Sequence, residues 1–426
     1  MNITSNNKII FLFIVLMIFS WLYPVYFVAD DWEHLNAYYG VGPDVYLRPW
    51  LFRLPGLYIT HQLIFPLFKN ELFFLGNFLC WSFLFSGLLL ILDYLNVLKK
   101  LLSEPLWFFV SFFFMLAFNG NNFEWLFWPT VMVNFPGFFA VGLGLWLTKN
   151  SKHWFRQVIK GILWGYGFYC YESLFFMGVL IQVSGELLKN RKFKDSMIPI
   201  LKQLFISILF LVISKSILSS IESYGYVSKV GFKKHLFTQS MSLIFLHDYY
   251  KTRWLTGGIN LLAILFLLWT TFRSLDRKSL LNKALPILIV FMVSISYYFV
   301  IMDYSARRAI GGQVFFSWGC LSLMYLNIKW KTHKNKIDKA VLILFPLCWI
   351  LHFSYVTSIK AIDKRSYQEN IVSVKKRIST SVNKLSVTRE EMVEGVETGW
   401  NVVNKDQERG WIKHVLTKEE IEKVSF

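Results

Sequence analysis

The sequence predicts an all-α polytopic membrane protein with about eleven transmembrane helices. The chain has 426 residues, of which 55% are hydrophobic, 19% aromatic and 17% charged, whereas soluble domains carry about 25% charged residues. The apolar residues form long runs near membrane-spanning length instead of alternating patterns. Most basic residues lie in short connectors between these runs, which is typical of cytoplasmic loops. The net charge of +18 therefore does not indicate nucleic acid as a partner.

Each predicted transmembrane helix is bounded by the charged or turn-forming residues that interrupt an apolar run. The first run has no small-residue cleavage site, so we expect it to remain as a helix. Because 153–188 is too long for one span, a tight turn at FYCYES divides it into two. The expected spans are 9–28, 71–97, 105–118, 131–148, 155–169, 172–188, 197–219, 256–273, 285–302, 312–328 and 340–358. Prolines interrupt the loop 29–70, whose middle is expected to form short amphipathic helices along the membrane surface or re-entrant helices.

Basic connectors set the predicted orientation, with the N-terminus in the cytoplasm. The connectors on the cytoplasmic side are 98–104, 149–160, 189–195, 273–284 and 329–339. The acid-rich first loop, the FYCYES turn, the 220–254 loop and the SARRA loop then face the periplasm or cell exterior. The arginines of the SARRA loop and Lys360, Lys364 and Arg365 oppose this orientation, but the inner connectors outnumber them.

The chain divides into a transmembrane domain, 1–358, and a polar C-terminal tail, 359–426, which is expected in the periplasm. The tetrapeptides Thr388–Glu391 and Thr417–Glu420 fit the capping-box pattern that begins helices. The tail is therefore interpreted as a small helical domain, and a flexible charged tail remains the alternative.

Polar groups expected on the outer face gather mostly at helix ends. They are Asp30, Asp31 and Glu33 after the first helix, Arg48 in the first loop, Glu172 at the FYCYES turn, His247 before the eighth helix, and Arg307 and Arg308 after the ninth. Arginine binds phosphate through a planar, bidentate fork, and a carboxylate accepts a proton from an attacking hydroxyl. A cavity combining both groups suits a substrate with a phosphate on a lipid and a reacting hydroxyl.

Each of these residues also has a purely structural explanation. Asp30 and Asp31 could cap the outer end of a helix beside an interfacial tryptophan. The arginine pair could bind lipid headgroups, and His247 could lie in a surface loop. Glu172 has apolar neighbours on both sides, so a carboxylate there is a functional candidate or a helix-packing group.

No cofactor is expected from the sequence. The four cysteines lie inside apolar runs without a CxxC pair, and no His, Cys and carboxylate spacing resembles a metal site. The adjacent acids Asp30 and Asp31 could hold a divalent cation together with a substrate phosphate, but nothing in the sequence requires one.

The motifs that carry a family resemblance are ADDW and LRPW and, more loosely, YESLF and ARRA. With them, the chain resembles the GT-C superfold of polyprenyl-phosphate-dependent glycosyltransferases. Within that superfold it is similar to the phage-type glucosyltransferases that convert serotype by modifying O-antigen. The resemblance implies an undecaprenyl-phosphate donor carrying a sugar such as glucose. It also implies a hydroxyl acceptor on a lipid-linked surface polysaccharide. The expected location is a bacterial inner membrane, with a small flippase and a donor-making glycosyltransferase as partners.

The resemblance also assigns roles to the candidate residues. Asp31 or Asp30 would be the general base, and Asp31 is favoured because it lies further from the helix end. Arg307 or Arg308 would hold the donor phosphate. Arg48 and Glu172 would line the sugar or acceptor site, with Glu33 and His247 also counted as substrate-binding.

Two other classes compete with a transferase: a lipid-linked sugar flippase or polysaccharide polymerase, and a non-catalytic membrane scaffold. A lipid-linked sugar flippase would carry charges deep in several helices, and this sequence has few, with Lys215 the clearest. A polysaccharide polymerase would carry one very large outer loop, and a scaffold would not need acids and arginines on one face.

Overall fold

The computed structural model describes three complete helices and shorter pieces of the chain. The described residues are 9–11, 13–14, 17–18, 66–67, 72–96, 98, 135–150, 153–170, 174–175, 178–179, 181–182, 185–186, 198, 201–202, 204–210, 212–213, 216, 351, 354, 358, 361–362, 364–366, 368–370, 372–381, 385–386, 419 and 422–425. These residues are mostly helical, as the predicted fold class requires. The spans expected at 105–118, 256–273, 285–302 and 312–328 lie outside them.

The helix α5, Phe73–Tyr94, corresponds to the span expected at 71–97. Its 22 residues are almost all apolar and reach about 33 Å, which matches the hydrocarbon thickness of a bilayer. Asn96 follows the helix with a φ of 61°, and its backbone N–H donates to the carbonyl of Asp93. A left-handed residue at this position ends a helix. Among the described residues, α5 is the one helix long and apolar enough to cross a membrane.

The helices α10, Phe135–Thr148, and α11, Trp154–Cys170, correspond to the spans expected at 131–148 and 155–169. Pro136 lies in the first turn of α10, where its missing N–H removes no helical hydrogen bond. The chain is therefore helical at both predicted positions, in two separate helices.

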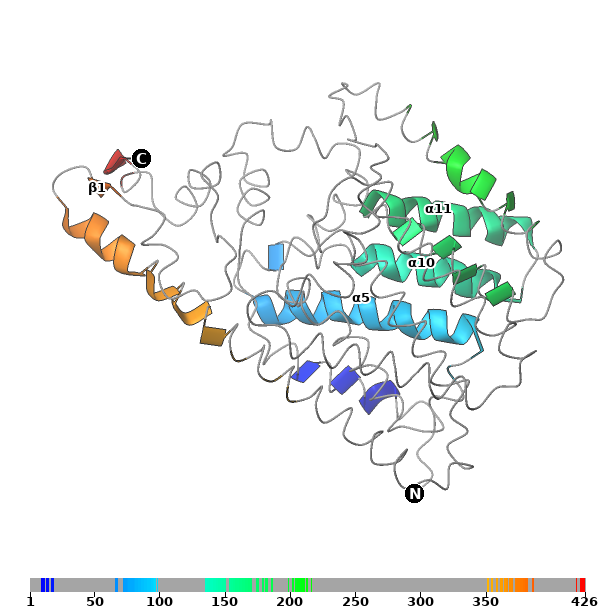
Figure 1. The fold of residues 1–426 in the computed structure, drawn as a ribbon, viewed down its shortest axis with the longest axis horizontal. Coiled ribbons are helices and arrows are strands. Elements are labelled where there is room, and N and C mark those ends of the chain that lie inside the picture. The colour runs from blue at the N-terminus through cyan, green and yellow to red at the C-terminus, as the bar shows by residue number, and fades with distance from the viewer. Residues whose placement is uncertain are drawn as a thin grey trace, which may run out of the picture.

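These three helices lie side by side, with α10 in the middle (Figure 1). Pieces of the first predicted helix flank α5, where the Phe13 and Phe85 rings meet edge to face at 5.4 Å. Pieces of the seventh flank α11, where Tyr169 and Phe210 meet at 6.3 Å. We call this assembly the helix row.

Close contacts show that α5 and α10 run in the same direction. Lys149, just after α10, forms a salt bridge of 3.0 Å with Asp93 in the last turn of α5. A methyl group placed on Gly142 would lie 2.7 Å from the backbone oxygen of Gly87. Glycine is required at Gly142 because the two backbones approach more closely than a Cβ atom allows.

The helix α11 runs in the opposite direction to α10. A methyl group on Gly137, near the start of α10, would lie 2.6 Å from the Cβ of Cys170 at the end of α11. Near the end of α10, a methyl on Gly144 would lie 3.2 Å from the Cγ of Lys160.

The described residues between 174 and 186 are helical and return along α10 in its own direction. Leu174 Cδ1 lies 3.0 Å from the Cβ position of Gly137, and Tyr94 Cε1 lies 2.7 Å from that of Gly185. These residues belong to the span expected at 172–188, so α11 and this segment form a helical hairpin.

Apolar side chains are exposed on both flanks of the helix row. On the α5 side they include Ile10, Phe11, Ile14, Met17 and Ile18. On the α11 side they are Ile198, Leu201, Phe205, Ile208, Leu209, Val212 and Ile213. Exposed apolar surfaces of this extent mark contact with a membrane or another protein.

The described residues from 351 to 380 are all helical, on both sides of the domain boundary predicted at 359. These described helical residues, called the C-terminal helix below, lie beyond the end of the row where α5 begins (Figure 1). After it, β1, Leu385–Ser386, pairs in parallel with β2, Val424–Ser425. The predicted capping box Thr388–Glu391 lies outside the described residues, and in the other box Glu419 is described as helical.

Candidate functional site

All of the predicted site residues lie outside the part of the chain that the structure describes. They are Asp30, Asp31, Glu33, Arg48, Glu172, His247, Arg307 and Arg308. Their roles therefore remain predictions. The described residues instead define the two ends of the helix row and one buried polar cluster.

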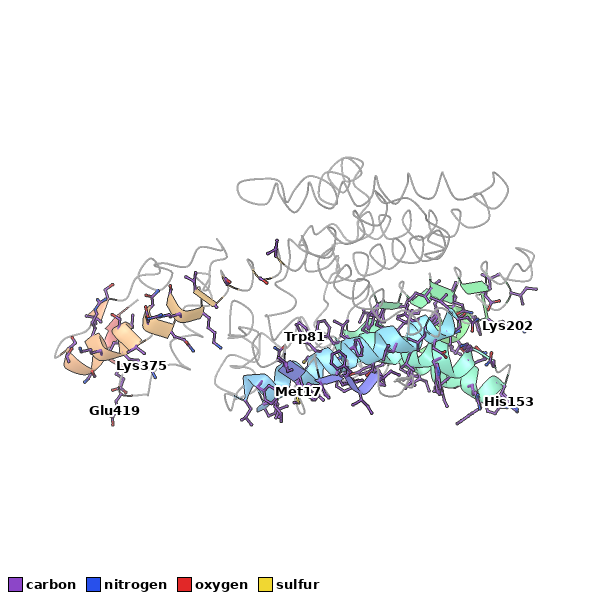
Figure 2. All side chains as sticks on the ribbon, turned by 90° about the horizontal axis from the view of Figure 1, so that it is seen from below. Met17, Trp81, His153, Lys202, Lys375 and Glu419 are labelled. Carbon is purple, nitrogen blue, oxygen red and sulfur yellow. The ribbon has the colours of Figure 1, made fainter. Side chains whose placement is uncertain are left out.

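The basic end of the row carries all of its described charged side chains. They are Asp93, Lys149, Arg156, Lys160, Glu186 and Lys202, and His153 lies at the same end. Figure 2 shows His153 and Lys202 together at this end, with Lys375 and Glu419 of the C-terminal part at the other. Basic side chains outnumber acidic ones here, and Lys149 and Asp93 form a salt bridge.

The apolar end of the row is formed by the start of α5, the start of α10 and the end of α11. None of the described residues in 72–77, 135–140 and 165–175 is charged. The two described residues nearest to Glu172 in the sequence, Cys170 and Leu174, both pack at this end against Gly137.

A buried polar cluster lies between α11 and the segment 174–186, toward the basic end. Lys160 is 2% exposed, and its Nζ donates a hydrogen bond of 2.8 Å to Gln182 Oε1. The same Nζ lies 4.7 Å from the centroid of the Trp164 ring. Glu186, one helical turn after Gln182, is also buried.

Glycines make room for this cluster. Gly144 of α10 faces the Lys160 stem, and a methyl group there would also approach Trp164 Nε1 to 3.3 Å. A methyl on Gly178 would lie 3.0 Å from Trp164 Cε2. The amide oxygen of Gln182 and the face of the Trp164 ring thus stabilise the buried charge of Lys160.

Lys160 belongs both to the span expected at 155–169 and to the connector expected at 149–160; its place in a helix is as predicted, and its burial is not. The structure places Lys160 within α11, among the largest fully buried side chains described. The prediction treated basic residues after an apolar run as a loop facing the cytoplasm. The missed signal is helical spacing: Lys160, Trp164 and Gly167 share one face of a helix beginning at Trp154.

The described residues do not suggest a metal centre. Within them, no group of three or more His, Cys, Asp or Glu side chains is placed to hold a metal ion. The ammonium group of Lys160 contacts an amide oxygen and a ring. Its geometry fits a structural role that fixes the register of the α11 hairpin.

No protein-family model, curated protein or solved structure matches the chain.

Proposed function

We propose that the protein is an integral-membrane glycosyltransferase. It transfers a sugar, with glucose as the expected one, from an undecaprenyl-phosphate donor to a surface polysaccharide such as O-antigen. The reaction takes place on the periplasmic face of the bacterial inner membrane. The observation that carries the proposal is the placement of Asp30 and Asp31 directly after the first apolar run, opposite in charge to the basic connectors.

The exposed apolar flanks of the helix row support insertion in a bilayer. In water, side chains such as Phe205, which is 68% exposed, would be unfavourable at this density. In a bilayer they contact lipid tails. The length and composition of α5 are consistent with the same environment.

The charge difference between the two ends supports the predicted orientation. The basic end faces the cytoplasm by the positive-inside rule, so the apolar end faces the periplasm. In the predicted alternation, the spans that contain α5 and α10 cross the membrane in one direction, and the span that contains α11 crosses in the other. The three helices have these relative directions. The C-terminal helix projects from the apolar end (Figure 1), as expected for a tail outside the membrane.

The proposed reaction is a single displacement at the anomeric carbon of the donor sugar. The acceptor hydroxyl oxygen forms the new glycosidic bond while its proton passes to the Asp31 carboxylate, or to Asp30. The bond between the anomeric carbon and the phosphate oxygen breaks, and the electron pair leaves with the lipid phosphate. The configuration inverts. Because phosphate is a good leaving group, the protein contributes positioning and charge stabilisation.

The test uses membranes that contain the chain, polyprenyl-phosphate glucose labelled in the sugar, and the host surface polysaccharide as acceptor. We expect Asp31→Asn to lower transfer by about 10²–10⁴, the usual contribution of a general base, while protein levels stay unchanged. Asp30→Asn has the large effect if that residue is the base. Transfer at the wild-type level by a correctly inserted double variant would contradict the proposal for this pair.

A second test addresses the phosphate-binding role. Loss of a charge-assisted hydrogen bond costs about 1.5–3 kcal/mol, so Arg307→Ala or Arg308→Ala should raise the donor concentration needed for half-maximal transfer at least about tenfold. The matched control is Lys278→Ala, which removes one charge from a predicted inner connector. Equal donor dependence in all three variants would remove the assignment.

One observation favours the alternative, a lipid-linked sugar flippase or polysaccharide polymerase. Lys160 and Glu186 are buried between helices, as charges along a translocation path would be. Lys160 lies about 9 Å along α11 from its first residue, close to the basic end. Its ammonium group contacts Gln182 and the Trp164 ring within the protein. A charge held in this way fits a structural role better than a translocation path, so we favour the transferase.

A further inference from the structure

The start of α11 exposes four consecutive side chains at the basic end of the row, those of His153, Trp154, Phe155 and Arg156. Trp154 is 73% exposed and Phe155 is 59% exposed, although removing such rings from water is favourable. The two rings contact each other edge to face, with their centroids 6.0 Å apart. They therefore form an apolar platform that stays largely uncovered by the rest of the protein.

Basic side chains accompany this platform. Arg156 directly follows the two aromatic residues and is exposed, and its Nη1 donates a hydrogen bond of 3.5 Å to the carbonyl oxygen of Leu147 at the end of α10. This bond uses one of the five N–H groups of the guanidinium. Lys202 is also exposed, and Figure 2 shows it at the same end of the row as His153.

Acidic side chains do not neutralise this end. Among its described residues, Asp93 forms a salt bridge of 3.0 Å with Lys149, and Glu186 is buried. Two neighbouring stretches outside the described residues have the same sign in the sequence. Lys152 precedes α11, and the connector 189–195 has basic residues at 191, 192 and 194 and one acid at 195. The complementary partner is therefore anionic.

The partner must also be apolar, because exposed apolar side chains surround both basic groups. Lys202 lies in the seventh predicted span beside Leu201, which is 60% exposed, and that span belongs to the exposed flank of the row. Phe210 of the same span packs directly on Gly165 of α11, so this flank adjoins the helix that carries the aromatic platform. A soluble polyanion would match the charges and leave the rings in water, whereas a neutral lipid would cover the rings and leave the charges unmatched.

We propose that the interfacial edge, defined as residues 153–156 together with Lys202, binds an anionic phospholipid. Arg156 and Lys202 donate hydrogen bonds to the phosphate oxygens of the headgroup. The Trp154 and Phe155 rings pack where the headgroup meets the acyl chains, the position that amphipathic aromatic rings favour, and the acyl chains lie along the exposed flank. The inference rests on the bilayer insertion in the proposed function and is independent of the transferase chemistry.

The experiment is native mass spectrometry of the purified full chain in neutral detergent micelles, with phosphatidylglycerol and phosphatidylcholine of identical acyl chains as probes. We expect the wild type to bind phosphatidylglycerol more tightly. Arg156→Gln/Lys202→Gln should weaken phosphatidylglycerol binding by about two- to thirtyfold, as expected for two exposed ionic contacts, and leave phosphatidylcholine binding unchanged. Arg156→Lys/Lys202→Arg keeps both charges and should retain the preference. Trp154→Ala/Phe155→Ala should weaken the binding of both lipids.

The matched control is Lys375→Gln/Lys376→Gln, which removes two of three adjacent exposed basic charges from the C-terminal helix and should leave lipid binding unchanged. Equal binding of the two lipids by the wild type, or unchanged binding in either the Arg156→Gln/Lys202→Gln or the Trp154→Ala/Phe155→Ala variant, would overturn the inference. Binding of an amphipathic Glu/Leu peptide that Arg156→Gln/Lys202→Gln abolishes, with lipid binding unchanged, would assign the edge to a protein partner instead.

The two proposals fail separately. Wild-type protein that prefers phosphatidylglycerol through the interfacial edge but transfers no sugar contradicts the transferase alone. Wild-type protein that transfers sugar but binds the two lipids equally contradicts this inference alone.

Discussion

The hydrogen bond between Lys160 and Gln182 gives the sharpest test of how the helix row is held together. The substitutions Lys160→Met and Gln182→Met keep chain length and remove one partner each. Lys160→Met leaves Gln182 Oε1 without the donor that lies at 2.8 Å. Gln182→Met removes the amide oxygen that accepts a hydrogen bond from Lys160, a lysine that is 2% exposed. The double variant replaces the pair with two apolar side chains of similar length.

The expected free energies follow from burial and from charge. A hydrogen bond to a charged group contributes about 1.5–3 kcal/mol in soluble proteins, and polar contacts between membrane helices average about 0.6 kcal/mol. Because this donor is charged and shielded from solvent, we expect a coupling free energy of about 1–2 kcal/mol between the two substitutions. Lys160→Met should cost more than Gln182→Met, since it also removes the contact with the Trp164 ring.

The assay is reversible unfolding of the purified protein in mixed micelles titrated with SDS and followed by circular dichroism. The four proteins of the double-mutant cycle give the coupling directly. Lys202→Met, an exposed lysine at the same end, should change the free energy of unfolding by less than about 0.5 kcal/mol. A coupling below about 0.3 kcal/mol would refute the reasoning, because the two side chains would then act independently.

Three further predictions concern packing and topology. Gly142→Ala should lower the free energy of unfolding by about 1–3 kcal/mol, because its methyl group would meet the backbone oxygen of Gly87; an unchanged value in the same SDS titration would contradict the close approach. Ile378→Ala removes a buried side chain and should lower the stability of the C-terminal part by about 2–4 kcal/mol. The measurement is the rate of proteolysis of the tail in sealed vesicles, which should rise. Equal rates for the variant and the wild type would show that the tail has no core. A periplasmic reporter should be active when fused after Phe426 and inactive after Asp195, and the reverse pattern would overturn the orientation and the proposed site together.

The helix positions could be predicted because long apolar runs determine them. The ends of α5, α10 and α11 lie within a few residues of the predicted bounds, since a charged or turn-forming residue interrupts each run. Their neighbours in space could not be predicted. The pairing of α5 with α10 depends on backbone contact at Gly87 and Gly142, and glycine has many other uses in a membrane helix.

The buried cluster shows where sequence reasoning fails. By charge alone, Lys160 is expected to face the cytoplasm at the basic end of its predicted helix, not to be buried. The partner that makes its burial possible, Gln182, lies on another helix, and no local pattern connects the two. The predicted catalytic acids and arginines lie outside the described residues, so chemistry at the outer face depends on the sequence pattern and on the experiments above.

The contact between Gly142 and Gly87 has a consequence for how any relatives with the same packing would diverge over evolutionary time. A Cβ atom at position 142 would collide with a backbone oxygen of Gly87, not with a side chain. No second substitution at position 87 can therefore relieve the collision, and compensating pairs of changes cannot arise between these positions. Among relatives sharing this packing, we expect glycine at 142 without covariation, so methods that infer contacts from correlated substitutions would overlook one of the closest helix contacts in the row.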